Sequence, residues 1–309
     1  MNSLGLPPII QGGMGAAVSS WQLAKVVAGQ GQLGVVSGTA LETVVARRLQ
    51  DGDEGGHMRE ALAHFPYPDV AAHVLDTFYR PNGRGGEPYR PMRRLSIKPH
   101  KEHDQLAVCA NFVEVWLAKQ AGNGKVGINF LEKLQTATPA ALYGAMLAGV
   151  DAILMGAGIP REIPQLMTDF AQGKSGSLTI DAERPAGVAA PVLAFDPLES
   201  FGVAPELPRP AFLAIVTAEV LASYLARNEV TRPDGFVVEH FMAGGHNAPP
   251  RRMQDTETGY GPLDEANIEK IRDVGLPFWL AGGRATPDAV ADAMAQGAAG
   301  VPVSYTHLT

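Results

Sequence analysis

The sequence has little cysteine, little charge and no long apolar run. Its 309 residues include one cysteine, Cys109, which excludes an intrachain disulfide framework and a cysteine-based zinc cluster. A single cysteine suits a reducing compartment, and we expect a cytoplasmic protein. No charged N-terminal segment precedes an apolar stretch, and no apolar run approaches the length of a membrane span. We therefore expect no membrane partner.

Basic residues are also sparse. Charged residues make up 18% of the chain, and the formal net charge is −7. The densest basic stretch, residues 84–101, is interrupted by proline, glycine and acid, and we interpret it as a solvated loop. Binding to a phosphate backbone needs a basic face, so we expect no nucleic-acid partner.

Glycine and proline, by contrast, are abundant. The 35 glycines and 24 prolines are spread along the chain, which is typical of tight connections between short elements. Eight short apolar runs are predicted to be strands, and most are apolar throughout, as expected of parallel strands covered on both faces. The predicted strands are residues 8–11, 33–36, 125–129, 151–155, 212–216, 235–239, 277–280 and 299–303.

Helical patterns lie between these strands. They cover residues 20–29, 39–50, 139–148, 218–226, 264–274 and 286–296. Ser19 or Ser20 is expected to cap the first helix, and Thr286, followed by Pro287, the last. Repeated strand–helix alternation indicates a parallel α/β fold, and eight repeats favour a closed (β/α)8 TIM barrel. We expect a single domain over residues 1–309.

Two stretches interrupt the alternation. Residues 51–123 are expected to form a helical and loop insertion between the second and third strands, and residues 177–180 and 191–195 could form a hairpin. Within the insertion, helical patterns cover residues 58–64, 71–78 and 106–121. The sequence ends in PVSYTHLT, where proline is poorly suited to a central strand and no eighth helix follows. We therefore expect a truncated or foreign C-terminus at residues 302–309.

Glycine recurs where the predicted strands end. Gly-Gly or Gly-x-Gly occurs in QGGMG at 11–15, MGAGIP at 155–160, AGGH at 243–246 and AGGR at 281–284. Each could simply make a turn, but glycine also lets the backbone approach a ligand closely. Reactive residues of parallel barrels lie at this end of the strands. The amides of Gly282 and Gly283, ahead of a predicted helix, are candidates for binding a phosphate.

His246 follows the sixth predicted strand, between Gly244-Gly245 and a proline pair. A lone histidine is more often structural than catalytic, but the glycines give a ligand access and the prolines stiffen the loop. No nucleophile or acid at a recognisable spacing completes a hydrolase triad, and His240, six residues earlier, does not define a ligand pair. We expect no metal site, and His246 fits proton transfer or stabilisation of negative charge.

The strand-end motifs resemble a known family. QGGMG, GIN at 127–129, AGGH and LAGG at 280–283, in this order, are similar to motifs of the nitronate monooxygenase (2-nitropropane dioxygenase) family of FMN-dependent barrels. The resemblance covers residues 7–301. It implies FMN as the cofactor, with Gly12, Gly13 and Met14 beside the flavin ring and Asn129 in contact with it.

The same resemblance implies roles for the later motifs. Gly244 and Gly245 would pass beside the flavin, Gly282 and Gly283 would hold its phosphate, and His246 would match the family's catalytic histidine. The chain departs from the family just before AGGH, where Glu239, His240 and Met242 replace the usual Gln, Gly and Glu. The family's glycine- and threonine-rich phosphate turn, expected after the eighth strand, is missing as well.

Three functions follow as hypotheses. In the first, the chain oxidises alkyl nitronates with FMN and dioxygen, and His246 serves as base or holds the substrate anion. In the second, it is an FMN-dependent enoyl-thioester reductase or NAD(P)H:quinone reductase, with His246 near the acceptor carbonyl. In the third, it is an inactive, truncated flavin-binding protein. The first two imply a small-molecule substrate.

Overall fold

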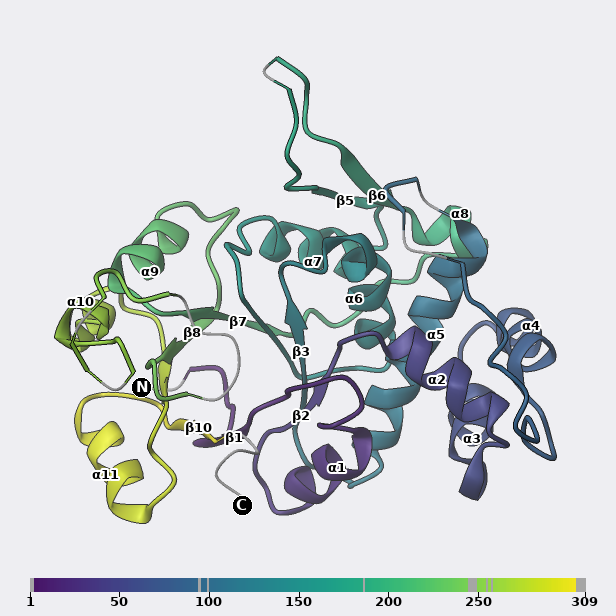
Figure 1. The fold of residues 1–309 in the computed structure, drawn as a ribbon, viewed down its shortest axis with the longest axis horizontal. Coiled ribbons are helices and arrows are strands. Elements are labelled where there is room, and N and C mark those ends of the chain that lie inside the picture. Colours follow the sequence, from purple (N-terminus) through teal and green to yellow (C-terminus); the bar gives the residue numbers. More distant parts are fainter. Residues whose placement is uncertain are drawn as a thin grey trace.

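The chain folds into an α/β barrel with helices outside a ring of parallel strands (Figure 1). The computed structural model describes residues 3–93, 96–98, 100–185, 187–243, 249–253, 255–256 and 258–303. Six strands form a continuous parallel sheet in the order β2-β3-β4-β7-β8-β9. They are β2 (Gly34–Ser37), β3 (Val126–Leu131), β4 (Ala152–Gly156), β7 (Ala211–Val216), β8 (Gly235–Glu239) and β9 (Phe278–Ala281).

Two further strands, β1 (Ile9–Gln11) and β10 (Val301–Val303), pair in parallel and complete the ring. On one side, the backbone N–H of Gln11 donates to the Leu33 carbonyl over 2.9 Å. On the other, the N–H of Leu280 donates to the Gly300 carbonyl over 3.1 Å. A Cβ atom at Gly300 would lie 1.8 Å from the Pro8 carbonyl oxygen, so this closure requires glycine. The predicted TIM-barrel fold is confirmed.

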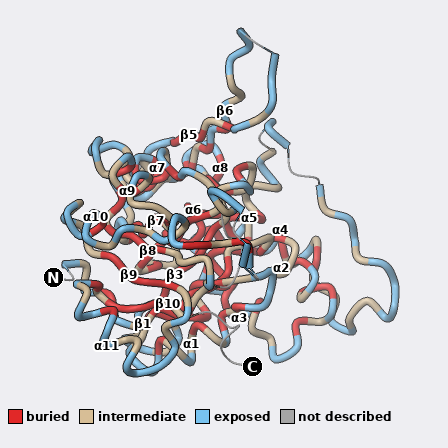
Figure 2. The backbone as a smooth tube through the Cα atoms, turned by 60° about the vertical axis from the view of Figure 1, so that its left-hand side comes forward, coloured by how far each residue is buried: buried red, intermediate tan, exposed pale blue. Residues whose placement is uncertain are grey.

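All eight predicted strands are present because their residues are apolar on both faces. Inward-facing side chains from different strands, among them Ile10, Val35, Leu154, Val237 and Trp279, pack together inside the barrel. The outward-facing residues pack against the helices in a second cluster. Figure 2 shows this buried interior as the red part of the tube. Burying one such side chain fully contributes about 1.5–3 kcal/mol to stability. Runs that are apolar on both faces are therefore favoured as strands that the barrel interior covers on one face and the helices on the other.

The outer layer contains the predicted helices and one more after β4. These helices are α1 (Trp21–Gly29), α2 (Leu41–Gln50), α6 (Thr138–Leu147), α7 (Ile163–Ala171), α9 (Glu219–Ala226), α10 (Ile268–Asp273) and α11 (Pro287–Ala295). Thr286 caps α11, since its side chain accepts the N–H of Ala289, and Gly275 and Gly297 end α10 and α11 with φ of 77° and 93°. Ser20 stands at the N-cap of α1 without a side-chain cap bond, so that predicted cap is absent.

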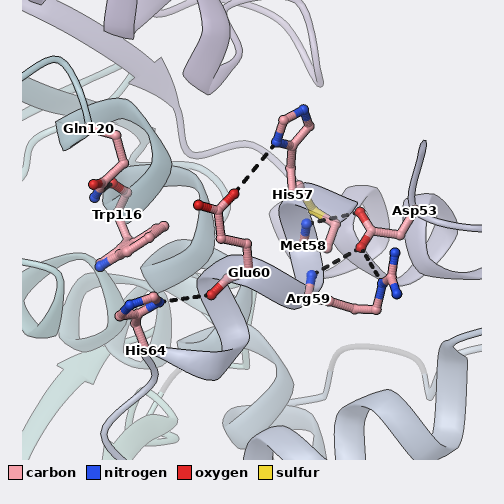
Figure 3. Close-up of polar contacts among 8 residues, drawn as sticks. All are labelled: Asp53, His57, Met58, Arg59, Glu60, His64, Trp116 and Gln120. Atoms are coloured by element: carbon pink, nitrogen blue, oxygen red, sulfur yellow. Dashed lines mark hydrogen bonds and ion pairs between the residues drawn. The ribbon is translucent and has the colours of Figure 1, made fainter. Parts of the chain in front are cut away.

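Between α2 and β3 the chain forms η1 (Glu54–Gly56), α3 (His57–Ala63), α4 (Pro68–Phe78) and the long helix α5 (Lys101–Lys119). Figure 3 shows how α3 is held. The Asp53 carboxylate accepts the backbone N–H groups of Met58 (2.9 Å) and Arg59 (3.0 Å), which anchors the first turn. His64 stacks on Trp116 of α5, with 4.4 Å between ring centroids.

The other interruption is the antiparallel hairpin of β5 (Gly176–Thr179) and β6 (Val192–Phe195), as predicted. The segment that joins them extends away from the barrel (Figure 1) and is largely exposed (Figure 2). A short helix, α8 (Pro197–Phe201), follows β6. Among the described residues, no helix has the length and apolar composition that a membrane span requires.

Pro302 corrects one sequence interpretation. We expected it to be poorly suited to a central strand, yet it lies in β10 opposite Ile10. Its neighbours bond to the residues that flank β1: the N–H of Val301 donates to the Pro8 carbonyl, and the carbonyl of Val303 accepts the N–H of Gly12. The pairing with β1 therefore does not require a donor at position 302. Residues 304–309 lie outside the described part of the chain.

Candidate functional site

A cavity lies at the carboxyl ends of the barrel strands, and we call it the mouth cavity. It contains about 520 Å³ of space, part of it open to solvent. Five of the predicted binding residues, which come from three separate segments, line it: Gly12, Gly13, Met14, Asn129 and Gly282. Its remaining lining is mainly apolar, with Ile10, Leu154, Ile215, Val237, Ala281 and Pro302. The barrel thus brings most of the predicted site together over an apolar floor.

Three predicted residues, Gly244, Gly245 and His246, lie outside the described residues. Ala243, which directly precedes them, lines the mouth cavity. The cavity therefore borders the start of this segment, and the role of His246 stays a prediction.

The loop after β1 is held close to the barrel wall. A Cβ atom at Gly13 would lie 2.7 Å from Val35 Cγ1 and 2.8 Å from the Val36 carbonyl oxygen, so this approach requires glycine. Ser19, which we considered as a helix cap, instead closes the loop. Its hydroxyl accepts the Met14 N–H (3.0 Å) and donates to the Gly12 carbonyl (3.2 Å). Its residue type alone did not reveal this role, because a serine before a helix usually indicates a cap.

Asn129 connects this loop to β3. Its Nδ2 donates to the Gly13 carbonyl over 2.8 Å, and its side chain is largely buried. Its Oδ1 atom is buried and accepts no hydrogen bond among the described residues. An unpaired buried acceptor costs about 1–3 kcal/mol, so this atom suits a hydrogen-bond donor on a bound molecule.

The Gly282-Gly283 segment forms the opposite rim. Both residues have positive φ, 100° and 66°, and a Cβ atom at Gly282 would lie 2.9 Å from His240 Cβ. Within the described chain, their backbone N–H groups donate no hydrogen bond, so both can face an anion. The first turn of α11 is less available, because Thr286 already caps it. Gly283 itself does not line the mouth cavity.

Glu239 is the acidic residue of the mouth cavity. It ends β8, and it also borders a smaller recess beside Phe241, Arg251 and Tyr260. Burial raises the pKa of its carboxyl from 4.5 to about 7. Near neutral pH this group can therefore hold or release a proton inside the cavity. The sequence signal was an acid at the end of an otherwise apolar strand.

His240, by contrast, directly follows β8 and does not line the mouth cavity. Its Nδ1 accepts the Met242 N–H over 3.1 Å, and its Nε2 lies 3.8 Å from a Glu265 carboxylate oxygen. Among the described residues, no three His, Cys, Asp or Glu side chains are arranged to hold a metal ion.

The glycine-containing segment after β4 does not join the mouth cavity. Gly158, Ile159 and Pro160 instead line a larger, separate cavity, which Leu178 of β5 also borders. Ala157 has a φ of 60°, so this segment bends sharply as it leaves the strand. The expected convergence of glycine segments therefore holds for the loops after β1 and β9, and not for this one.

Comparison with solved structures identifies similar folds. FabK from Thermotoga maritima aligns with a TM-score of 0.50 and 16% identity, over 96% of this chain and 58% of that chain. Nitroalkane oxidase from Streptomyces ansochromogenes aligns with a TM-score of 0.46 and 16% identity, over 96% and 65%. The enoyl reductase domain of MlnA from Bacillus amyloliquefaciens aligns with a TM-score of 0.46 and 12% identity, over 97% and 54%.

At 16% identity, the similarity to FabK concerns the barrel fold alone. This chain spans less than two thirds of the length of each of these three structures. No protein-family model matches the chain, and no curated protein matches it.

Proposed function

We propose that this chain is the FMN-binding barrel of a flavin-dependent oxidoreductase and that the mouth cavity holds the flavin. The observation that carries the proposal is the convergence of Gly12–Met14, Asn129 and Gly282 around one cavity at the carboxyl ends of the strands. A barrel fold alone would not define this function, since the fold serves many chemistries.

The residues present fit FMN in three ways. The Asn129 Oδ1 atom, unpaired among the described residues, matches a donor on a flavin ring. Gly13 lines the cavity without a side chain, so a planar ring can approach the backbone there. The backbone N–H groups of Gly282 and Gly283 suit the phosphate. When bound, FMN supplies the redox chemistry by accepting and returning electrons.

The chain's own groups would manage binding and protons. The apolar floor excludes water, and Glu239 can hold a proton that faces the cavity. For the reaction, we infer oxidation of an alkyl nitronate, with dioxygen as co-substrate and His246 as base or anion holder. The basis is the family resemblance of the AGGH segment.

A second reaction is supported by Glu239. A carboxyl with a pKa of about 7 is partly protonated at neutral pH, so it can donate a hydrogen bond to a carbonyl oxygen that gains negative charge. That chemistry fits reduction of an enoyl thioester or a quinone.

FMN binding tests the cofactor assignment through Asn129. Flavin fluorescence should be quenched on titration into the wild-type chain, and Asn129→Leu should weaken binding at least tenfold, about 1.4 kcal/mol. Asn111→Leu is the matched control, because Asn111 is also buried, donates one bond to Ala107 (2.9 Å) and has an unpaired Oδ1. Equal losses in both variants, or no binding by the wild type, would contradict the proposal.

Anaerobic mixing of the FMN-loaded protein then separates the two reactions. Bleaching of the flavin by a nitronate and not by NAD(P)H supports nitronate oxidation. The reverse result supports the reductase. In the first case His246→Asn should lower turnover at least tenfold while FMN stays bound, and an unchanged rate would refute the role of His246.

A further inference from the structure

Another pocket, apart from the cavities described above, lies between α2, the segment at residues 89–93 and the start of α5. It contains about 790 Å³ of space, part of it open to solvent. Three arginines line it, Arg47 of α2 together with Arg90 and Arg93, and we call it the arginine pocket. Glu42, in the first turn of α2, is the carboxylate in its lining. Three positive charges against one negative charge leave a net charge of +2.

The positive charges of these three arginines are not neutralised by ion pairs within the described residues. Three other arginines of this region have a carboxylate partner: Arg48 with Glu114, Arg59 with Asp53 at 3.0 Å, and Arg84 with Asp51 at 2.9 Å. Arg80 instead donates to the carbonyls of Tyr79 and Thr77, and Arg90 Nη1 also donates to the Thr77 carbonyl (3.2 Å). For Arg47, Arg90 and Arg93, no carboxylate of the described residues lies within ion-pair distance. Unneutralised guanidinium groups around one recess are the arrangement that phosphate recognition uses.

The wall of the pocket is held in place before any ligand binds. The Tyr89 hydroxyl donates to Asp51 over 2.7 Å, and the backbone N–H of Arg90 donates to Gln50 Oε1 over 2.6 Å. The guanidinium of Arg47 lies 4.9 Å from the centre of the Tyr89 ring. These contacts fix the segment against α2, so a ligand would not have to order it.

The pocket runs along α2, from Glu42 in its first turn to Arg47 and Gln50 in its last turn. Helix α2 follows β2, so its first turn lies at the carboxyl end of that strand. Helix α5 leads into β3, so its first residues, including the pocket residue His103, lie at that end as well. The pocket therefore reaches the mouth-cavity end of the barrel at Glu42 and His103, and it extends from there along α2 toward Arg47 and Gln50.

We propose that the arginine pocket binds the phosphate or diphosphate group of a phosphorylated small molecule. The charge of +2 matches a phosphate dianion, and guanidinium groups can each donate two parallel hydrogen bonds to its oxygens. The hydroxyl of Thr43, also in the lining, adds a donor. This binding is independent of flavin chemistry and needs no flavin in the protein.

Calorimetric titration of the FMN-free chain with inorganic pyrophosphate tests the proposal. Saturable binding is expected, and Arg47→Gln and Arg90→Gln should each raise the Kd at least tenfold. Arg59→Gln is the matched control, because Arg59 lies in the same region but pairs with Asp53. Titration with ADP distinguishes the source: tighter binding than pyrophosphate indicates a nucleotide, and equal binding indicates recognition of the phosphates alone.

Several results would overturn the proposal. Pyrophosphate binding that is absent, or unchanged by both pocket substitutions, would show that the pocket is not the site. Citrate binding as tightly as pyrophosphate would refute the preference for phosphate. Circular dichroism of each variant checks its fold, and a loss of binding in Arg59→Gln equal to the loss in the pocket variants would also count against the proposal.

Discussion

The Glu239→Gln substitution should stabilise the protein, and the gain should grow with pH. Burial raises the pKa of Glu239 from 4.5 to about 7. As the pH rises through 4.5, the unfolded chain loses this proton first, while the folded chain keeps it until about pH 7. The favourable contribution of this carboxyl to the free energy of unfolding is therefore complete below pH 4.5 and is lost as the pH rises through 7. A difference of about 2.5 pKa units corresponds to about 3 kcal/mol at pH 8.

Urea unfolding of both proteins at pH 5 and pH 8 measures this difference. We expect the variant's free energy of unfolding to exceed that of the wild type by up to about 3 kcal/mol at pH 8, and by much less at pH 5. Glu219→Gln is the control with the opposite sign. Backbone hydrogen bonds, including one from Asn267, lower the pKa of Glu219. Glu219→Gln should therefore be less stable than the wild type at pH 8. A Glu239→Gln gain that is equal at both pH values would refute the burial argument.

Two further substitutions test the loop after β1 and a buried ion pair. Gly13→Ala should weaken FMN binding at least tenfold in fluorescence titration, because its Cβ atom would lie 2.7 Å from Val35 Cγ1; Gly29→Ala, whose Cβ atom has 3.9 Å of clearance, should bind normally. Burial opposes ionisation of Asp151, but hydrogen bonds from Lys119 (2.8 Å), the Val126 N–H and Lys125 outweigh it and lower its pKa. Asp151→Asn should therefore cost about 2 kcal/mol in urea unfolding at pH 7, and the loss should shrink as the pH falls below 3.8; a pH-independent loss would contradict this reasoning.

The strands could be predicted because their signal is local. Each is a short run that is apolar on both faces, as in Val35–Val36, and such runs have few alternatives to burial inside the ring. The helix start at Thr286, followed by Pro287, has the same local character, and Thr286 does cap α11. The binding glycines at 12, 13 and 282 could be located because barrel topology brings the ends of the strands together.

Other features depend on contacts between distant residues, which one sequence does not reveal. Ser19 has the position of a helix cap, and only the folded loop shows that its hydroxyl bonds Gly12 and Met14. Pro302 is compatible with a strand because its neighbours make the bonds to the residues that flank β1. The described residues between 84 and 100 form the mostly exposed loop that we expected, but the pairing of Tyr89 with Asp51 is not visible in the sequence.

Hydrogen–deuterium exchange with and without FMN tests the central claim most directly. We predict that FMN slows exchange in peptides that cover residues 9–15, 126–131 and 278–285, because each of these ranges contains residues that line the mouth cavity. The amides of Gly282 and Gly283, which bond nothing else in the described chain, should show the largest change. No change in these peptides, or protection confined to residues 84–93 beside the arginine pocket, would contradict the assignment of the mouth cavity to the flavin.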